Sequence, residues 1–312
     1  MSAAGTILIT DCDHPTTDVE RAIVEAAGLR LQVAQCRTAA EVVAVGTASA
    51  AVGLIVQYAP ITGDVLRELP ACRVVGRYGV GLDTIDLATA AELGIRVVNV
   101  PDYCTDEVAD HALGLILALT RGIVPLDRGV QAGTWDFRLA GRVRRASSQR
   151  LGVIGLGRIG SALARRALAL GYDVVGTDPR GPRDSGVPTV PLEELLASSD
   201  VVSIHAPLDS TTRHLIDART LALMRPTAIV VNTSRGGLVD HDALVDALRA
   251  GTLAGAALDV LEREPIPGDD PLIGMPNVVL SPHAAFYSEE SLVEMKQKVS
   301  RRVLDALAGA GG

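Results

Sequence analysis

The sequence predicts an α/β protein built on parallel sheets, and three observations support this class. Short apolar runs alternate with helical patterns along most of the chain, which is the order of βαβ units. Hydrophobic residues make up 48% of the sequence but aromatic residues only 3%, so small aliphatic side chains must fill the interior. The length of 312 residues exceeds what one small core organises and favours two domains.

The first hundred residues contain five expected strands and four expected helices. The strands are expected at residues 6–10, 31–35, 52–57, 73–76 and 96–100. The helices are expected at residues 17–27, 39–46, 62–69 and 86–93. Because the helices alternate with the strands, this part of the chain should form a parallel sheet.

A longer helix is expected to begin at Thr105, which can cap it, and to stop at Gly122. Asp106 and Glu107 complement the positive end of its dipole. Its apolar residues form one wide stripe, which predicts burial across a domain or subunit boundary: Val108, Ala109, Ala112, Leu115, Ile116 and Leu119. Residues 123–150 lose this periodicity and are interpreted either as a surface arm or as a dimer-forming arm.

The alternation restarts at Leu151 with the motif GLGRIG. Gly155, Gly157 and Gly160 directly follow a strand pattern and open a helix pattern. In that context Gly155 permits a tight turn, Gly157 lets the backbone approach a pyrophosphate, and Gly160 allows close helix packing. The sequence therefore predicts a dinucleotide site with the diphosphate at the helix N-terminus.

Asp178 ends the second strand of this unit, 23 residues after Gly155. A carboxylate there can accept hydrogen bonds from the adenosine ribose and repels a 2′-phosphate, which favours NAD over NADP. Arg180 and Arg183 lie just beyond and weaken this preference. The alternative interpretation is that Asp178 only caps a turn.

Three later segments place polar residues after apolar strands. Arg235 follows the strand in AIVVNTSRGGLVD, before a helix that Asp240 should cap. Asp259 and Glu264 follow the strand in AGAALDVLEREP, and His283 follows the strand in NVVLSPHAAF. In a doubly wound sheet such strand ends border the cofactor crevice, so these residues can converge there.

An arginine, a carboxylate and a histidine form a complete set for reducing a 2-oxo acid. The guanidinium of Arg235 can bind the substrate carboxylate, and His283 can donate a proton as hydride arrives. Glu264 can pair with the histidine and favour its charged form. Taken singly, each residue also has a plain alternative as a surface ion pair, a loop carboxylate or a structural histidine.

The motifs GLGRIG, NTSRGGLVD, GAALDVLEREP and SPHAA, in this order and spacing, resemble the D-isomer-specific 2-hydroxyacid dehydrogenase family. The resemblance runs from about Gly76 to Lys298. It implies an NAD-dependent reduction of a 2-oxo acid to a D-2-hydroxy acid, and the reverse reaction. In that reaction Arg235 would bind substrate, Glu264 would pair with the histidine, and His283 would be the acid/base.

The resemblance also implies further binding residues. The backbone N–H groups of Val80 and Gly81 would hold the substrate carboxylate, with Tyr58 near the pocket. Arg77 is either a second anion site or a structural ion pair. The cofactor contacts implied besides the three glycines are Thr105, Arg158, Ile159, Asp178, His205, Pro207, Thr212, Thr233 and Asp259.

The family fold implies a flavodoxin-like substrate domain, residues 1–99 plus 286–312, with a Rossmann NAD-binding domain, residues 100–285, inserted between. It also implies a homodimer formed through the long helix and the arm, residues 105–150.

Within the family, HAAFYSEESLVEM is closest to the C-terminal-binding-protein branch, with Phe286 at that branch's tryptophan position. Phe286 would form an apolar wall of the side-chain pocket. Thr84 stands where many relatives carry asparagine. Two other functions stay open: an NAD-sensing scaffold for protein partners, and a dehydrogenase of formate or phosphite.

Composition excludes other classes of partner. The formal net charge of −8 argues against nucleic acid, which is approached through a basic face. The four cysteines form no C-x-x-C pair, so we expect reduced core thiols, no metal site and a cytoplasmic protein. The N-terminus lacks a signal-peptide pattern, and no membrane partner is expected. The sequence does not name the 2-oxo acid.

Overall fold

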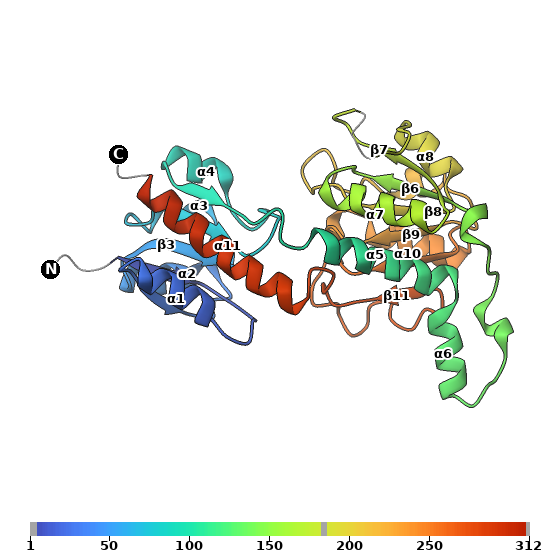
Figure 1. Cartoon of the computed structure of the whole chain (residues 1–312), viewed down its shortest axis with the longest axis horizontal. Coiled ribbons are helices and arrows are strands. Elements are labelled where there is room, and N and C mark those ends of the chain that lie inside the picture. Colours follow the sequence, from blue (N-terminus) through green and yellow to red (C-terminus); the bar gives the residue numbers. More distant parts are fainter. Residues whose placement is uncertain (1–4, 182–185, 310–312) are drawn as a thin grey trace. The chain divides into compact units, whose positions relative to one another are not determined.

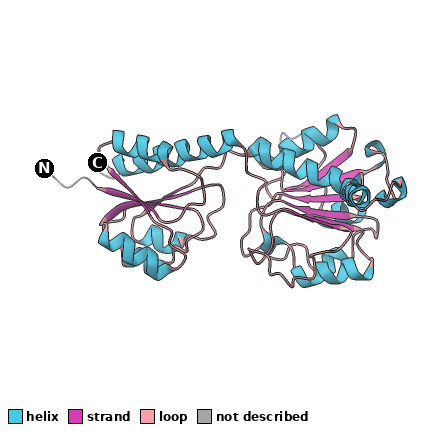
Figure 2. Cartoon of the chain, turned by 90° about the horizontal axis from the view of Figure 1, so that it is seen from below, coloured by secondary structure: helices cyan, strands magenta, loops and turns pink. Residues whose placement is uncertain are grey.

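The structure, a computed structural model, describes residues 5–181 and 186–309 and divides into two compact units (Figure 1). Unit 1 comprises Met1–Tyr103 and Ser288–Gly312, and unit 2 comprises Cys104–Tyr287. The sequence places the corresponding divisions after residues 99 and 285, a few residues earlier in each case. Each unit carries its own parallel sheet with helices on both faces (Figure 2).

Unit 1 contains one five-stranded parallel sheet in the order β2-β1-β3-β4-β5, which is the flavodoxin-like order. Its strands are β1 Thr6–Ile9, β2 Arg30–Val33, β3 Ala51–Val56, β4 Val74–Arg77 and β5 Arg96–Val98. Its helices are α1 Asp18–Ala26, α2 Ala39–Ala48, α3 Gly63–Arg67, α4 Leu87–Glu92 and α11 Glu289–Ala308. All nine elements expected in the first hundred residues are confirmed, with bounds shifted by a few residues.

The last helix, α11, returns to pack on the sheet of unit 1, in line with the family resemblance, which assigns residues 286–312 to the same domain as residues 1–99. Ser288 caps it by accepting a hydrogen bond from the Ser291 N–H at 2.9 Å. On the sheet side, a Cβ at Gly76 would overlap the side chain of Val303. The glycine therefore lets α11 approach β4 closely.

Unit 2 contains a six-stranded parallel sheet in the order β11-β10-β9-β8-β6-β7. Its strands are β6 Arg150–Ile154, β7 Asp173–Thr177, β8 Val201–Ile204, β9 Ile229–Asn232, β10 Gly255–Leu258 and β11 Val278–Leu280. A single parallel bridge between Gly176 and Thr189 extends the sheet beyond β7. The unit therefore has the Rossmann strand order, with the third strand reduced to that bridge.

The helices of unit 2 lie on both faces of this sheet (Figure 2). They are α5 Thr105–Thr120, α6 Ile123–Gln131, α7 Arg158–Ala169, α8 Leu192–Ser198, α9 Ala218–Leu221 and α10 His241–Ala250. Short 3-10 segments are η1 Phe137–Ala140, η2 Ala146–Ser148 and η3 Gly236–Leu238. The apolar stripe of α5 is buried inside unit 2, where it packs beside α7 and against the sheet.

One local prediction for this region is wrong, and one helix was not predicted. Thr105 does not cap α5, because Cys104 occupies the N-cap position and Thr105 is the first helical residue. The stop at Gly122 is confirmed, because α5 ends at Thr120 and Gly122 follows its C-cap in the left-handed region with φ 62°. A further helix, α6, then begins at Ile123. That helix was missed because Pro125 interrupts the pattern, although proline is tolerated in a first helical turn.

No single helix among the described residues is both long and apolar enough to cross a membrane. Helices α5 and α6 meet those requirements only when counted together, and they are bent by 63° at their junction.

Candidate active site

Three neighbouring strands of unit 2 end at the same level of the sheet. In the strand register Asn232 of β9 pairs with Leu258 of β10, and Leu258 pairs with Leu280 of β11. Since Arg235 and His283 lie three residues beyond their strands, the loops that carry them leave the sheet at one edge. The convergence expected from the sequence is therefore present in the fold.

His283 and Glu264 form a close pair. Nδ1 of His283 lies 2.7 Å from Oε2 of Glu264, and the other carboxylate oxygen accepts a hydrogen bond from the Leu261 N–H at 2.9 Å. Burial raises the pKa of Glu264, but its hydrogen bond to His283 and the charges of His283 and Arg235 outweigh burial and lower that pKa overall. The carboxylate is thus held in its charged form beside the imidazole.

The loop that carries His283 is anchored on Asp259. His283 has a φ of 51°, which is uncommon for a residue other than glycine, and its N–H donates to the Asp259 carbonyl at 2.8 Å. The buried Asp259 carboxylate accepts hydrogen bonds from the N–H groups of Ala284 and Ala285, each at 2.9 Å. It also accepts from Ser281 Oγ at 2.6 Å. Asp259 therefore fixes the turn, and a cofactor contact from it stays a prediction.

Arg235 sits on a loop that is held from both sides. Asn232 Nδ2 donates to the Arg235 carbonyl at 2.8 Å, and Ser234 Oγ donates to the Ile204 carbonyl of β8 at 2.8 Å. The next residue, Gly236, lies so close to the Leu261 backbone that a Cβ would overlap it. The loop with Arg235 therefore packs directly on the segment that leads to Glu264.

The glycine motif has the local geometry that a diphosphate requires. Gly155 has a φ of 91°, and a Cβ there would fall 2.6 Å from the His205 carbonyl oxygen. A Cβ at Gly160 would overlap the Gly155 carbonyl, so only glycine fits there. Gly157 differs, because a Cβ there would meet no described atom within 4 Å. Open space therefore lies in front of the α7 N-terminus, where a dinucleotide diphosphate binds.

Asp178 follows β7 and reaches back to the glycine loop. Its carboxylate accepts a hydrogen bond from the Leu156 N–H at 3.1 Å and from the Arg180 N–H at 3.0 Å. The hydrogen bond from the Arg180 guanidinium is the largest cause of the lowered pKa of Asp178. The residue thus caps a turn and also faces the nucleotide loop. Arg183, the second basic residue considered in the sequence, lies outside the described residues.

Two other predicted cofactor residues present buried polar atoms. Burial lowers the pKa of His205 to about 4, and its Nε2 lies 2.9 Å from Ser203 Oγ. Its Nδ1, like Thr233 Oγ1, has no hydrogen-bond partner among residues 5–181 and 186–309. Buried polar groups normally find partners, so these atoms, with the space at Gly157, fit a bound dinucleotide.

The remaining predicted cofactor residues lie in a loop or at the first residues of helices in unit 2. Thr105 begins α5, while Arg158 and Ile159 begin α7. Thr212 Oγ1 donates to the Pro207 carbonyl at 2.7 Å, which closes the turn after β8. Their contact with a cofactor stays a prediction.

The predicted substrate residues fall in both units. In unit 1 Tyr58 is exposed, Val80 and Gly81 lie in the loop after β4, and the Arg77 guanidinium folds back against that loop. In unit 2 the Phe286 ring meets the His283 ring edge-on, with centroids 6.4 Å apart. Phe286 is thus placed beside the proposed proton donor.

Sequence reasoning missed several residues that hold these loops. Asp11, two residues after β1, accepts hydrogen bonds from the backbone N–H groups of Gln57, Tyr58 and Ala59, the tightest at 2.6 Å to Tyr58. Its place at a strand end, like that of Asp178, was the available signal.

Helix α5 also contributes to the site through His111. Its Nε2 lies 2.9 Å from Ser281 Oγ and 3.5 Å from Asp259 Oδ1. No spacing in the sequence relates His111 to the histidine loop 170 residues later, so only the fold reveals this contact.

The dinucleotide fold of unit 2 and the histidine–carboxylate pair beside it define a nicotinamide-dependent oxidoreductase. A family model described as D-isomer specific 2-hydroxyacid dehydrogenase, NAD binding domain, matches residues 113–285. A glyoxylate reductase from Korarchaeum cryptofilum is 43% identical over 259 residues, which cover 78% of this chain and 76% of that protein. The chain belongs to the D-isomer-specific 2-hydroxyacid dehydrogenase family and binds NAD(H).

Solved structures agree over nearly the whole chain. The D-lactate dehydrogenase of Aquifex aeolicus, complexed with NAD and lactic acid, has a TM-score of 0.86 at 28% identity and covers 97% of this chain and 96% of its own. An acyclic imino acid reductase in complex with NADPH and D-Arg has a TM-score of 0.88 at 26% identity, covering 98% and 97%. Similar folds therefore occur with either dinucleotide.

Proposed function

We propose that this protein reduces a small 2-oxo acid to the D-2-hydroxy acid with NADH, and catalyses the reverse reaction. The observation that carries the proposal is the 2.7 Å pair of His283 Nδ1 and Glu264 Oε2 at the end of β11. Since Nδ1 faces the carboxylate, Nε2 is the ring nitrogen that can exchange a proton with substrate. Bound NADH would supply the hydride.

Three side chains have separate roles in the proposed reaction. The Arg235 guanidinium binds the substrate carboxylate and polarises the neighbouring ketone. His283 delivers a proton to the oxygen as negative charge develops there. Glu264 stays ionised and stabilises the imidazolium form of His283. In the reverse direction neutral His283 removes the hydroxyl proton.

The substrate residues follow the family pattern. We propose that Val80 and Gly81 hold the carboxylate through their N–H groups and that Tyr58 and Phe286 border the side-chain pocket. Arg77 is a further candidate for binding an anion. Unit 1 is accordingly the substrate domain and unit 2 the NAD domain.

A panel of 2-oxo acids tests the reaction. Glyoxylate, hydroxypyruvate, phenylpyruvate and phosphorylated analogues are each mixed with NADH, and absorbance at the nicotinamide band is followed. We expect at least one to oxidise NADH, and His283→Ala to lower kcat by roughly 10²- to 10⁴-fold with NADH binding preserved. If none is reduced above background by the pure protein, the proposal is overturned.

The two alternatives are less well supported. A scaffold that only senses NAD needs no Arg235, Glu264 and His283, yet all three stand on converging loops. A formate or phosphite dehydrogenase would turn over its own anion and no 2-hydroxy acid, which the same panel distinguishes. Membership of the C-terminal-binding-protein branch rests on HAAFYSEESLVEM alone and stays a prediction.

We propose NADH over NADPH as the preferred coenzyme because the buried Asp178 carboxylate lies beside the glycine loop and would repel a 2′-phosphate. We also propose a cytoplasmic location, which is supported by four buried cysteines that form no disulfide among the described residues.

A homodimer formed through residues 105–150 completes the proposal. Ile123, Val130, Trp135 and Phe137 are exposed apolar residues of this segment, and Trp135 is 90% exposed. Large exposed apolar surfaces usually mark an interface. Sedimentation equilibrium should give a dimer that Trp135→Asp dissociates, while Leu87→Asp, an exposed control in unit 1, should not. A monomeric wild-type protein at micromolar concentration would refute this assembly.

A further inference from the structure

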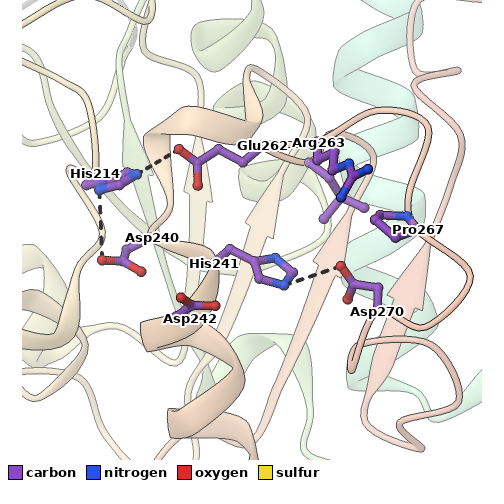
Figure 3. Close-up of a pocket in the computed structure, with 9 residues that line it drawn as sticks. His214, Asp240, His241, Asp242, Glu262, Arg263, Pro267 and Asp270 are labelled. Carbon is purple, nitrogen blue, oxygen red and sulfur yellow. Dashed lines mark hydrogen bonds and ion pairs between the residues drawn. The ribbon is translucent and has the colours of Figure 1, made fainter.

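Unit 2 contains a polar pocket of ≈ 440 Å³ next to the loops that carry Arg235 and Glu264 (Figure 3). Figure 3 shows His214 between two carboxylates, with a second histidine paired separately to Asp270. The lining residues are His214, Asp240, His241, Asp242, Leu261, Glu262, Arg263, Pro267 and Asp270. The pocket therefore lies between the loops that follow β8, β9 and β10, and histidine–carboxylate pairs connect these loops.

The His214 side chain contacts two of these loops. Nε2 lies 2.9 Å from Glu262 Oε1, and Nδ1 lies 3.8 Å from Asp240 Oδ2. Arg213, the preceding residue, also pairs with Glu262 Oε1. One imidazole therefore connects the segment before α10 with the segment that follows β10.

The backbone of His214 is locked onto the loop that carries Arg235. Its N–H donates to the Gly237 carbonyl at 2.8 Å, and its φ of 51° is uncommon for any residue except glycine. Two residues later, Ile216 exchanges hydrogen bonds with Leu238 at 3.0 Å and Asp240 at 2.8 Å. The backbone of His214 is therefore fixed beside the loop that carries Arg235.

On the other side, Glu262 belongs to the short segment that orients Glu264. The Leu261 N–H donates to Glu264 Oε1 at 2.9 Å, which leaves Oε2 for His283. Gly236 packs on the peptide that joins Leu261 and Glu262. Holding the Glu262 side chain therefore also holds the N–H group that orients the Glu264 carboxylate.

We propose that His214 is a positioning residue for the Glu264–His283 pair. Through Glu262 it fixes the 261–264 segment against the loop that carries Arg235. The inference rests on the proposed function, since it concerns the same acid/base pair. A small displacement of a catalytic group lowers the rate by one to two orders of magnitude. Loss of the contact between His214 and Glu262 should therefore lower the catalytic rate measurably.

A double-mutant cycle tests the inference. Glycine adopts the backbone conformation of residue 214 without strain, so His214→Gly removes the side chain alone. We expect kcat/KM for the best 2-oxo acid to fall about tenfold, with the Kd for NADH unchanged. In a Glu264→Gln background the same change should cost less than about twofold. An equal loss in both backgrounds would show that His214 does not act through Glu264.

Matched variants guard against a general loss of structure. His241→Asn removes the neighbouring contact to Asp270, at 3.3 Å, and should leave kcat/KM unchanged. Glu262→Gln keeps the side-chain shape and should reproduce the effect of His214→Gly. The Tm of His214→Gly reports whether that variant folds. If it does not fold, Glu262→Gln replaces it in the same experiment.

A readout without turnover separates this inference from the proposed function. In ¹⁵N-histidine-labelled protein, the chemical shift of His283 Nδ1 reports its hydrogen bond to Glu264, and His214→Gly should change that shift. An unchanged shift overturns the role of His214 even if no 2-oxo acid is a substrate. If the wild-type enzyme is inactive but the His283 shift does change in the variant, the proposed function alone is overturned.

Discussion

His283 Nδ1 lies 2.7 Å from Glu264 Oε2, and the two residues reach this distance from different loops. Asp259 fixes the histidine turn through three backbone N–H groups, while the Leu261 N–H orients the glutamate. Neither side chain depends on the other to find its place. The pair is therefore preorganised for proton transfer before substrate arrives.

The first prediction concerns the charge of Glu264. Glu264→Gln replaces the ionised carboxylate with a neutral amide, so the His283 imidazolium loses the charge that stabilises it. Reduction requires a proton from that imidazolium, so the descending limb of the pH–rate profile should move to lower pH. The measurement is kcat/KM for reduction from pH 5 to 9. An unmoved limb would contradict a functional pair.

The second prediction concerns coenzyme choice. Asp178→Ala removes the carboxylate that repels a 2′-phosphate and releases the Arg180 guanidinium, now bonded to Asp178 at 3.1 Å. The ratio of kcat/KM with NADPH to that with NADH should rise about tenfold or more. Arg180→Ala is the matched control and should not raise this ratio. If Asp178→Ala leaves the ratio unchanged, the assignment of the ribose contact is wrong.

Much of this site follows from the sequence because its residues stand directly after buried strands. The apolar runs before Arg235, Asp259 and His283 indicate strands, and parallel strands place their carboxyl ends at one edge. The strand ends are local patterns that a single sequence retains. The pairing of Glu264 with His283 joins two loops, and the family resemblance implies it.

Other features depend on contacts that no local pattern records. Helix α6 buries none of its residues fully, so it lacks the apolar stripe that reveals α5. His214 resembles any loop histidine until the fold places it 2.9 Å from Glu262, 48 residues away. The His111–Ser281 contact likewise joins α5 to a distant strand end. Such residues act through tertiary geometry, which spacing along the chain does not encode.

The third prediction concerns stability and His205, whose pKa burial lowers to about 4. Between pH 6.5 and 4 the unfolded chain binds a proton that the folded protein excludes, so stability is lost as pH falls through this window. The loss attributable to His205 is at most about 2 kcal/mol between pH 7 and pH 5. Urea unfolding at both pH values should give a smaller pH effect for His205→Asn. Equal pH effects would show that His205 titrates normally.

The last prediction separates two glycines of one motif. A Cβ at Gly157 meets no described atom within 4 Å, whereas a Cβ at Gly160 overlaps the Gly155 carbonyl. Gly157→Ala should therefore leave the Tm unchanged but weaken NADH binding, because the methyl group occupies the space that a diphosphate needs. Gly160→Ala should instead lower the Tm of the apo protein, because backbone must move.

Calorimetric Tm values without coenzyme and NADH fluorescence titrations supply both quantities. We expect the Kd of Gly157→Ala to rise about tenfold or more, which corresponds to at least about 1.4 kcal/mol of binding free energy. Arg165→Ala, a change at an exposed position of the same helix, controls for effects on α7 itself. Tight NADH binding by Gly157→Ala would place the diphosphate elsewhere, and an unchanged Tm for Gly160→Ala would show that the α7 contact with the glycine loop can relax.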